Sequence, residues 1–289
     1  MHPAAIFRLM RPRQWVKNAF VVAPLFFSPW VVNAASMRAV AIAVVVFCLL
    51  SSAVYVINDY FDREGDRLHP EKKLRPLASG EVTPGQGIAL ATALLILSAA
   101  LSNFLLPPRF AVFAGTYFAI NLLYSIWLKQ VAILDVLIVA AGFVLRIDAG
   151  ASVIDVSPSV WISLATGLLA LFMALAKRRD DLVKTMTNTH RASLSGYNLR
   201  FVDTCLAMTL AALIVCYLMY TTDTETIRRF KTEHLWLTST FVIAGVMRYL
   251  QITLVEERSG SPTDIVLTDR FLIVTVVGWA FAFGVLIYG

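Results

Sequence analysis

The sequence predicts an all-α, polytopic membrane protein: a bundle of nine transmembrane helices with an active-site cavity on the cytoplasmic side. Of its 289 residues, 58% are hydrophobic and only 15% are charged, and the mean hydropathy is +0.71. Soluble domains carry roughly 25% charged residues. Several apolar runs approach or exceed the ~20 residues that a helix needs to cross a bilayer. Because these runs follow one another closely, residues 1–289 are predicted to form a single transmembrane domain.

The expected spans follow from the apolar runs between charged or turn-forming segments. They cover approximately residues 16–32, 38–57, 86–106, 110–128, 131–150, 159–176, 202–220, 235–252 and 270–288. The first run follows a long basic segment and is interrupted by Pro24 and Pro29. We therefore expect a retained helix there and not a cleaved signal peptide.

The distribution of basic residues predicts the orientation. Lys and Arg collect in the N-terminal segment and in the loops after the second and sixth expected spans, as is typical of cytoplasmic loops. We therefore expect a multi-pass protein of the inner (plasma) membrane with a cytoplasmic N-terminus. The two long charged loops, about residues 58–85 and 177–201, are predicted to form cytoplasmic caps.

The net charge of +6 is explained by this topology. No nucleic-acid partner is expected, because the basic residues are divided among short loops. The three cysteines lie within apolar spans, and the four histidines are scattered. The sequence therefore gives no indication of a zinc site, a disulfide or a Ser-His-Asp hydrolase.

Three carboxylates follow the second expected span at helical spacing. Asp59, Asp62 and Asp66 stand at i, i+3 and i+7, so on a helix they share one face, with Asn58 at its edge. Mg²⁺ prefers oxygen ligands and usually binds through one or two carboxylates together with substrate phosphates. The pattern predicts a metal–phosphate site. A solvated helix end, where acids and bases pair, is the structural alternative.

Basic residues near these carboxylates are candidates for binding anions. Arg75 could fold back over a diphosphate, with Lys73 assisting, and Arg63 lies near the acidic face. In the second charged loop, Lys177, Asp181 and Lys184 share a helical face. This face suits either a second phosphate or metal contact or an ordinary salt-bridged helix end.

Ionisable residues within the spans are functional candidates, because they are costly in a bilayer. Arg146 could bind a lipid phosphate or diphosphate. Tyr124 and Lys129 close the fourth expected span, where Lys129 either binds phosphate or extends to the interface as an anchor. Lys17 stands at the mouth of the first expected span.

The acidic motif resembles a known family. Asn58-Asp59-x-x-Asp62-x-x-x-Asp66, followed by Arg75-Pro76-Leu77-Ala78-Ser79-Gly80, resembles the first aspartate motif of the UbiA-type intramembrane prenyltransferase superfamily. Within it, the opening Arg11-Pro12-Arg13-Gln14-Trp15-Val16-Lys17-Asn18 is similar to the decaprenyl-phosphate phosphoribosyltransferase branch. Aromatic prenyltransferases usually carry a second Asp-x-x-x-Asp motif, which Asp180-Asp181 followed by Lys184 does not supply.

The resemblance implies an Mg²⁺-dependent enzyme with two anionic substrates. It would transfer 5-phosphoribose from 5-phosphoribosyl 1-diphosphate to a polyprenyl phosphate, releasing pyrophosphate and forming a precursor of cell-envelope glycans. Asp59, Asp62 and Asp66 would hold the metal. The residues expected to contact substrates are Lys17, Asn58, Arg63, Lys73, Arg75, Tyr124, Lys129, Arg146, Lys177, Arg178 and Asp181.

Two alternatives remain open at the level of sequence. An aromatic prenyltransferase would use the same acidic motif for a prenyl diphosphate. A transporter with a charged cytoplasmic gate would also accommodate intramembrane Asp135 and Arg146. Neither the isoprenoid chain length nor the oligomeric state follows from the sequence, and a homo-oligomer is compatible with it.

Overall fold

The computed structural model describes residues 3–70, 72–185, 195–256 and 262–288. Over these residues the chain is helical, without strands, as expected. Eight of the described helices are long and apolar enough to cross a membrane by length and composition. The chain divides into two compact units, residues 1–158 and residues 159–289.

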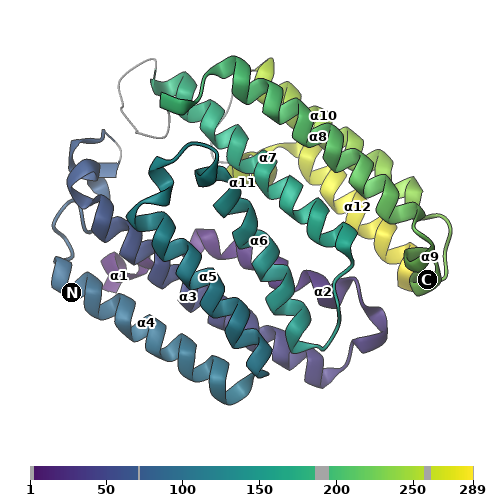
Figure 1. Ribbon diagram of the computed structural model, residues 1–289, viewed down its shortest axis with the longest axis horizontal. Coiled ribbons are helices and arrows are strands. Elements are labelled where there is room, and N and C mark those ends of the chain that lie inside the picture. Colours follow the sequence, from purple (N-terminus) through teal and green to yellow (C-terminus); the bar gives the residue numbers. More distant parts are fainter. Residues whose placement is uncertain (1–2, 71, 186–194, 257–261, 289) are drawn as a thin grey trace. The chain divides into compact units, whose positions relative to one another are not determined.

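The first unit is organised around one long helix. Its elements are α1 (Pro3–Met10), η1 (Pro12–Val21), α2 (Ala23–Phe26), η2 (Pro29–Val31), α3 (Ala34–Leu68), η3 (Lys72–Leu74), α4 (Pro84–Leu105), α5 (Pro108–Ile126), η4 (Leu128–Gln130) and α6 (Leu134–Val153). Helix α4 runs along α3, and α5 packs against both α3 and α6 (Figure 1). Phe47 of α3 and Phe110 of α5 are fully buried at the centre of this core.

The first expected span is not a single long helix. Residues 12–31 form three short helices in place of the continuous span expected over 16–32. Inside a continuous helix a proline lacks a hydrogen-bond donor and its ring would clash with the preceding turn. Here Pro24 and Pro29 stand at the starts of α2 and η2, so each begins a new short helix. This segment accounts for the difference between the nine expected spans and the eight long apolar helices among the described residues.

Sequence signals at the helix ends explain where the neighbouring helices begin. Asn33 caps α3 by accepting hydrogen bonds from the N–H groups of Ala35 and Ser36, both at 2.9 Å. Thr83 and Gln86 form a reciprocal capping box at the start of α4. Gly80, with φ of 82°, permits the tight turn that precedes this helix.

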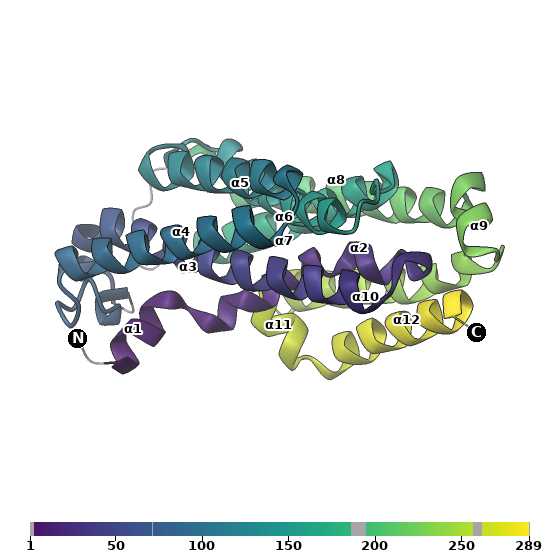
Figure 2. The same ribbon diagram turned by 90° about the horizontal axis from the view of Figure 1, so that it is seen from below.

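The second unit is a separate set of packed helices. Its elements are α7 (Val160–Thr185), α8 (Leu199–Thr222), α9 (Thr224–Phe230), η6 (Leu235–Thr238), α10 (Ser239–Leu254), α11 (Pro262–Thr268) and α12 (Arg270–Tyr288). Helices α7 and α8 pack side by side, as do α10 and α12 (Figure 1). The short helix α9 follows α8 at one end of this unit (Figure 2).

Candidate active site

Helix α3 presents three carboxylates beyond its apolar part. The helix has 35 residues, more than the ~20 needed to span a bilayer, and its last turns are rich in charge. It is continuous through Asn58, Asp59, Asp62 and Asp66, as the spacing predicted. Asp59 is 2% exposed and Asp66 is 5% exposed. Carboxylates that are so well buried require charged or hydrogen-bonding partners.

Each of these carboxylates contacts a basic side chain. Nη1 of Arg75 lies 2.6 Å from Oδ2 of Asp66 and 3.2 Å from Oδ1 of Asp59, so one guanidinium bridges two carboxylates. Nζ of Lys129 forms an ion pair with Asp62. Nδ2 of Asn58 donates to the other oxygen of Asp62 at 2.9 Å. The structure thus brings together the predicted acids with Asn58, Arg75 and Lys129.

A compact turn after α3 positions Arg75. The N–H of Ser79 donates to the carbonyl of Arg75 at 2.8 Å, and the N–H of Val82 donates to that of Pro76 at 2.9 Å. Leu77 and Val82 anchor this turn in a small core shared with α1 and α4. The turn therefore returns Arg75 to the acidic face of α3.

Arg11, the first residue of the opening motif but not a predicted site residue, also contacts the acidic face. Nη2 of Arg11 lies 2.5 Å from Oδ1 of Asp59, and its guanidinium stacks over Tyr55 at 5.3 Å from the ring centroid. The neighbouring segment is held on α3 through Ser52, whose hydroxyl donates to the carbonyl of Met10 at 2.9 Å. The same hydroxyl accepts from Nε1 of Trp15 at 3.0 Å. These contacts place the start of η1 against the α3 carboxylates.

Arg146 has partners different from those expected. It is 4% exposed, and it donates to Oδ1 of Asn18 at 3.0 Å, the carbonyl of Gly142 at 2.7 Å and the hydroxyl of Tyr117 at 2.9 Å. Its guanidinium also stacks on Tyr117 at 4.6 Å and on Phe143 at 5.3 Å. Arg146 thus ties η1, α5 and α6 together through neutral oxygens and aromatic faces.

The other predicted residues of the first unit lie around this centre. Arg63 turns to Glu64, at 3.1 Å, and to the ring of Tyr60, so it does not face the α3 carboxylates. Lys73 is exposed on η3. Lys17 on η1 and Tyr124 near the end of α5 are half-buried.

The α3 carboxylates offer oxygen ligands of the kind that a divalent cation prefers. Among the described residues, no three His, Cys, Asp or Glu side chains converge closely enough to form a ready-made metal cage. Instead, Nη1 of Arg75 contacts both Asp59 and Asp66, two of the carboxylates that would hold a cation. A cation that arrives with phosphate oxygens needs only one or two carboxylates. The residues present therefore fit a cation bound together with a diphosphate.

The second charged motif lies in the second unit, at the end of α7. Lys177 is exposed, while Arg178 and Arg179 are buried. Nη1 of Arg178 lies 2.5 Å from Oδ2 of Asp181, one helical turn away. Lys177, Arg178 and Asp181 belong to this unit, whereas the α3 carboxylates belong to the first.

Arg179 is a structural cation that the sequence analysis did not assign. Its Nε donates to Asp203 of α8 at 2.7 Å, and its Nη1 donates to the carbonyl of Thr253 of α10 at 2.8 Å. Arg179 therefore joins three helices of the second unit. Its partners lie 24 and 74 residues away in the chain, so helical spacing gives no signal for them.

A second ion-pair group joins the two last long helices. Nη2 of Arg248 lies 2.7 Å from Oδ2 of Asp269, and Nη1 lies 2.7 Å from Glu256. Asp269 also caps α12 by accepting from the N–H of Leu272 at 3.0 Å. The hydrogen bond from Arg248 holds the pKa of the Asp269 carboxyl below its usual value.

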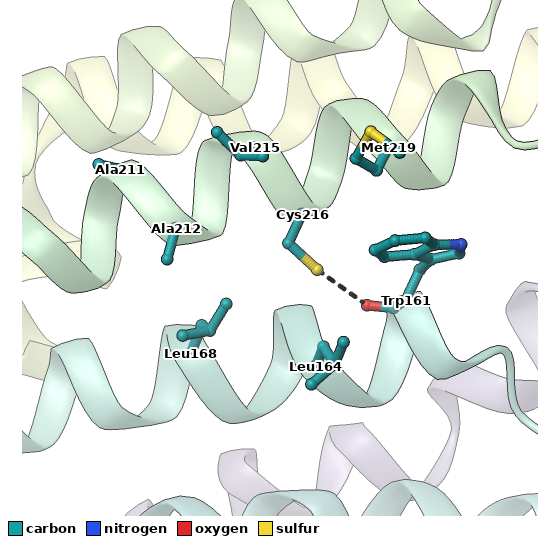
Figure 3. A pocket seen from close by; sticks show the side chains of 8 residues that line it. All are labelled: Trp161, Leu164, Leu168, Ala211, Ala212, Val215, Cys216 and Met219. Carbon is teal, nitrogen blue, oxygen red and sulfur yellow. Dashed lines mark hydrogen bonds between the residues drawn. The ribbon is translucent and has the colours of Figure 1, made fainter.

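An apolar groove lies between α7 and α8 (Figure 3). It has a volume of about 460 Å³, and its walls include Trp161, Leu168, Val215 and Met219. Sγ of Cys216 donates to the carbonyl of Trp161 at 3.5 Å within it. Because no charged side chain lines this groove, it has no group that would hold a phosphate or a metal ion.

Comparisons with known proteins identify the family and the fold. Decaprenyl-phosphate phosphoribosyltransferase of Mycolicibacterium smegmatis is 34% identical over 297 residues, with 99% of this chain and 93% of the relative covered. The enzyme of the same name from Corynebacterium glutamicum is 32% identical, with 97% and 86% covered. A UbiA homolog from Archaeoglobus fulgidus, solved with GPP and Mg²⁺ bound, has the same fold, with a TM-score of 0.75 at 21% identity, covering 99% of this chain and 100% of that one. The model of the UbiA prenyltransferase family matches residues 19–220, and the chain belongs to this family.

Proposed function

We propose that the protein transfers 5-phosphoribose from 5-phosphoribosyl 1-diphosphate to the phosphate of a polyprenyl lipid. In this reaction the bond between C1 of ribose and the diphosphate oxygen breaks, and a bond from C1 to a lipid phosphate oxygen forms. Pyrophosphate leaves. The observation that carries the proposal is the group of three α3 carboxylates, each contacted by a basic side chain, in a chain whose near full-length relatives are named for this transfer.

The α3 carboxylates form the donor half of the proposed site. Asp59, Asp62 and Asp66 would hold a divalent cation, which we take to be Mg²⁺, on the diphosphate. When bound, such a cation stabilises negative charge on the leaving group as a Lewis acid. Arg75 lies within reach of the same position and would contact the diphosphate directly. Arg75 and Asn58 thus orient the donor and hold the acids in place.

The lipid phosphate acceptor requires nearby positive charge, and it does not require a general base. A lipid phosphate is already an anion, so its oxygen can attack C1 without losing a proton to a side chain. Two anionic substrates repel one another, and nearby cations reduce that repulsion. Lys129, with its side chain 13% exposed, is suited to this role, with Lys17, Lys73 and Tyr124 as further proposed contacts.

The remaining predicted cations have indirect or separate roles in this proposal. Arg146 already donates to three neutral oxygens, so we assign it a supporting role as a buried positive charge that fixes η1. Arg63, paired with Glu64, would act only after that pair opens. In the second unit, Lys177, Arg178 and Asp181 remain proposed contacts to a substrate phosphate.

We place the N-terminus and the carboxylates on the cytoplasmic side of the plasma membrane. Arg67 lies in the last turn of α3, Lys73 follows it on η3, and Arg8 pairs with Glu81 in the turn after them. Basic residues favour the cytoplasmic side. That side would also supply a water-soluble phosphoribosyl donor to the site.

A labelling experiment tests the choice of donor. Membranes containing the protein would receive 5-phosphoribosyl 1-diphosphate labelled in the ribose, with a polyprenyl phosphate and Mg²⁺. We expect the label in an organic-extractable lipid and an equal amount of pyrophosphate in the aqueous phase. Membranes containing the Asp62→Asn variant serve as the control.

Two other results would contradict the proposal. Product formed only from a prenyl diphosphate and an aromatic acid would identify an aromatic prenyltransferase. Solute flux into proteoliposomes without Mg²⁺-dependent release of pyrophosphate would identify a transporter.

A further inference from the structure

Arg11 adopts an unfavourable backbone conformation at the junction of α1 and η1. Its φ is 53° and its ψ is 59°, in the left-handed region that side chains other than glycine rarely occupy. The next residue, Pro12, further restricts the conformations open to Arg11. Such a conformation persists only where surrounding contacts impose it. Contacts of Arg11 with its surroundings must therefore hold this conformation.

The guanidinium of Arg11 donates to a carboxylate oxygen of Asp59 that a bound metal ion would also need. Oδ1 of Asp59 accepts from Nη2 of Arg11 at 2.5 Å and from Nη1 of Arg75 at 3.2 Å. The Asp59 side chain is 2% exposed, whereas the Arg11 side chain is 26% exposed. A divalent cation bound to Asp59 would meet two guanidinium groups at this one carboxylate. Like charges at such distances repel strongly, so at least one guanidinium must leave.

Of the two arginines on Asp59, Arg11 is easier to displace than Arg75. Arg75 keeps a second carboxylate, Asp66, at 2.6 Å when it loses Asp59. Within the described part of the chain, Asp59 is the one carboxylate that Arg11 contacts. Once displaced, Arg11 would be a half-exposed cation beside the bound metal ion. A diphosphate that arrives with the metal supplies the negative charge that Arg11 then requires.

We propose that Arg11 is a diphosphate-binding residue which, without ligand, is held on Asp59 and moves to the diphosphate when a divalent cation takes its place. The ion pair with Asp59 keeps the guanidinium near the site, and the guanidinium weakens cation binding until an anion arrives. Metal and diphosphate therefore bind cooperatively. The inference rests on the proposed function only in that the donor carries a diphosphate.

Calorimetric titration of the full-length protein in detergent tests the exchange. The probes are Mn²⁺ alone and inorganic pyrophosphate at saturating Mn²⁺, and the variant is Arg11→Gln. We expect Mn²⁺ alone to bind several-fold more tightly, because its competitor is gone. We expect the dissociation constant of pyrophosphate to rise by about tenfold or more, because one charge-assisted hydrogen-bond partner is lost. These opposite changes distinguish an exchanging residue from a structural one.

Arg13→Gln is the matched control, because Arg13 is an exposed arginine two residues away. It should change neither constant. Unchanged pyrophosphate affinity in Arg11→Gln would overturn the proposal, whatever the affinity for Mn²⁺. Weaker binding of Mn²⁺ alone in this variant would also overturn it. If Arg11→Gln does not fold, Arg11→Lys replaces it, keeping the charge without the planar fork. Its pyrophosphate affinity should lie between those of wild type and background, and a wild-type value would overturn the proposal.

This test is independent of the acceptor chemistry. Pyrophosphate is common to a phosphoribosyl donor and a prenyl donor. If the labelling experiment identifies a different donor, the calorimetric result still decides the role of Arg11. If Arg11→Gln leaves pyrophosphate binding unchanged while ribose label reaches the lipid, the inference fails and the proposed function stands.

Discussion

The ends of α3 and α7 both carry dense charge, but their charges are satisfied in different ways. At the end of α3, the carboxylates contact cations that come from other elements, 16, 48 and 67 residues away in the chain. At the end of α7, Arg178 pairs with Asp181 on its own helix, and Arg179 bonds across to α8 and α10. The first arrangement leaves cations that a ligand can displace. The second joins helices to one another.

The side-chain exposures support this distinction. Arg11 and Arg75 are each 26% exposed, although the Asp59 that they share is 2% exposed. Arg179 is 8% exposed and contacts a buried backbone carbonyl. Charge density by itself therefore does not identify an active site. The exchangeability of the partners is the better indicator.

Removing a carboxylate from α3 should have the largest effect. We expect Asp59→Asn and Asp62→Asn each to lower turnover by about 10²–10³-fold, because the leaving group loses charge stabilisation. Mg²⁺-dependent pyrophosphate release measures this. Asp203→Asn in α8 is the control, and it should affect thermal stability more than turnover. Near-normal turnover in both α3 variants would refute the metal assignment.

A methyl group at Gly150 should disrupt the segment that presents Arg11. A Cβ at this position would lie 2.0 Å from the carbonyl oxygen of Val21, so η1 and α6 would have to separate. We expect Gly150→Ala to destabilise the protein by about 1–3 kcal/mol or more. Gly115→Ala is the matched control, because its Cβ would meet nothing within 4 Å. Equal melting temperatures in detergent for the two variants would contradict the close packing of η1.

Removing the Arg179 contacts should reduce stability with little effect on chemistry. Arg179→Met leaves Asp203 and the carbonyl of Thr253 without this donor, which we expect to cost about 1–3 kcal/mol. Thermal unfolding in detergent measures the loss, and turnover per folded molecule should stay within a few-fold of wild type. A thousandfold loss of turnover with unchanged melting would place Arg179 in the chemistry and remove the contrast between the two helix ends.

The ion pair of Asp269 should give the smallest effect, and one that depends on pH. Because Arg248 lowers the pKa of Asp269 in the folded protein, the pair stabilises the fold above the ordinary carboxyl range. This contribution is lost as the pH falls through the lowered pKa. Asp269→Asn should therefore destabilise the protein at pH 7 by less than about 1 kcal/mol, and the difference should shrink in acid. Melting curves of wild type and Asp269→Asn at pH 7 and near pH 3 measure this. A difference in melting temperature that grew on acidification would contradict the prediction.

The amino-acid sequence alone determined the class of the fold and the shared helical face of three carboxylates. Apolar run length indicates membrane-spanning helices, and the local spacing of Asp59, Asp62 and Asp66 places them on one helical face. The sequence predicted one span over residues 16–32, whereas residues 12–31 form short helices docked on α3 and α6. That outcome depends on polar contacts with residues distant in sequence, such as Ser52, and on the missing side chain of Gly150.

Only the tertiary structure decided which cation meets which carboxylate. Helical periodicity relates residues a few positions apart, whereas Arg11, Arg75 and Lys129 reach α3 along separate paths of the chain. Arg63 shows the limit most clearly: its sequence position favoured the acidic face, yet its side chain pairs with Glu64. Arg146 donates to Asn18 and Tyr117, which its position in the sequence did not predict. Long side chains take the partners that packing brings within reach, and packing is a property of the whole fold.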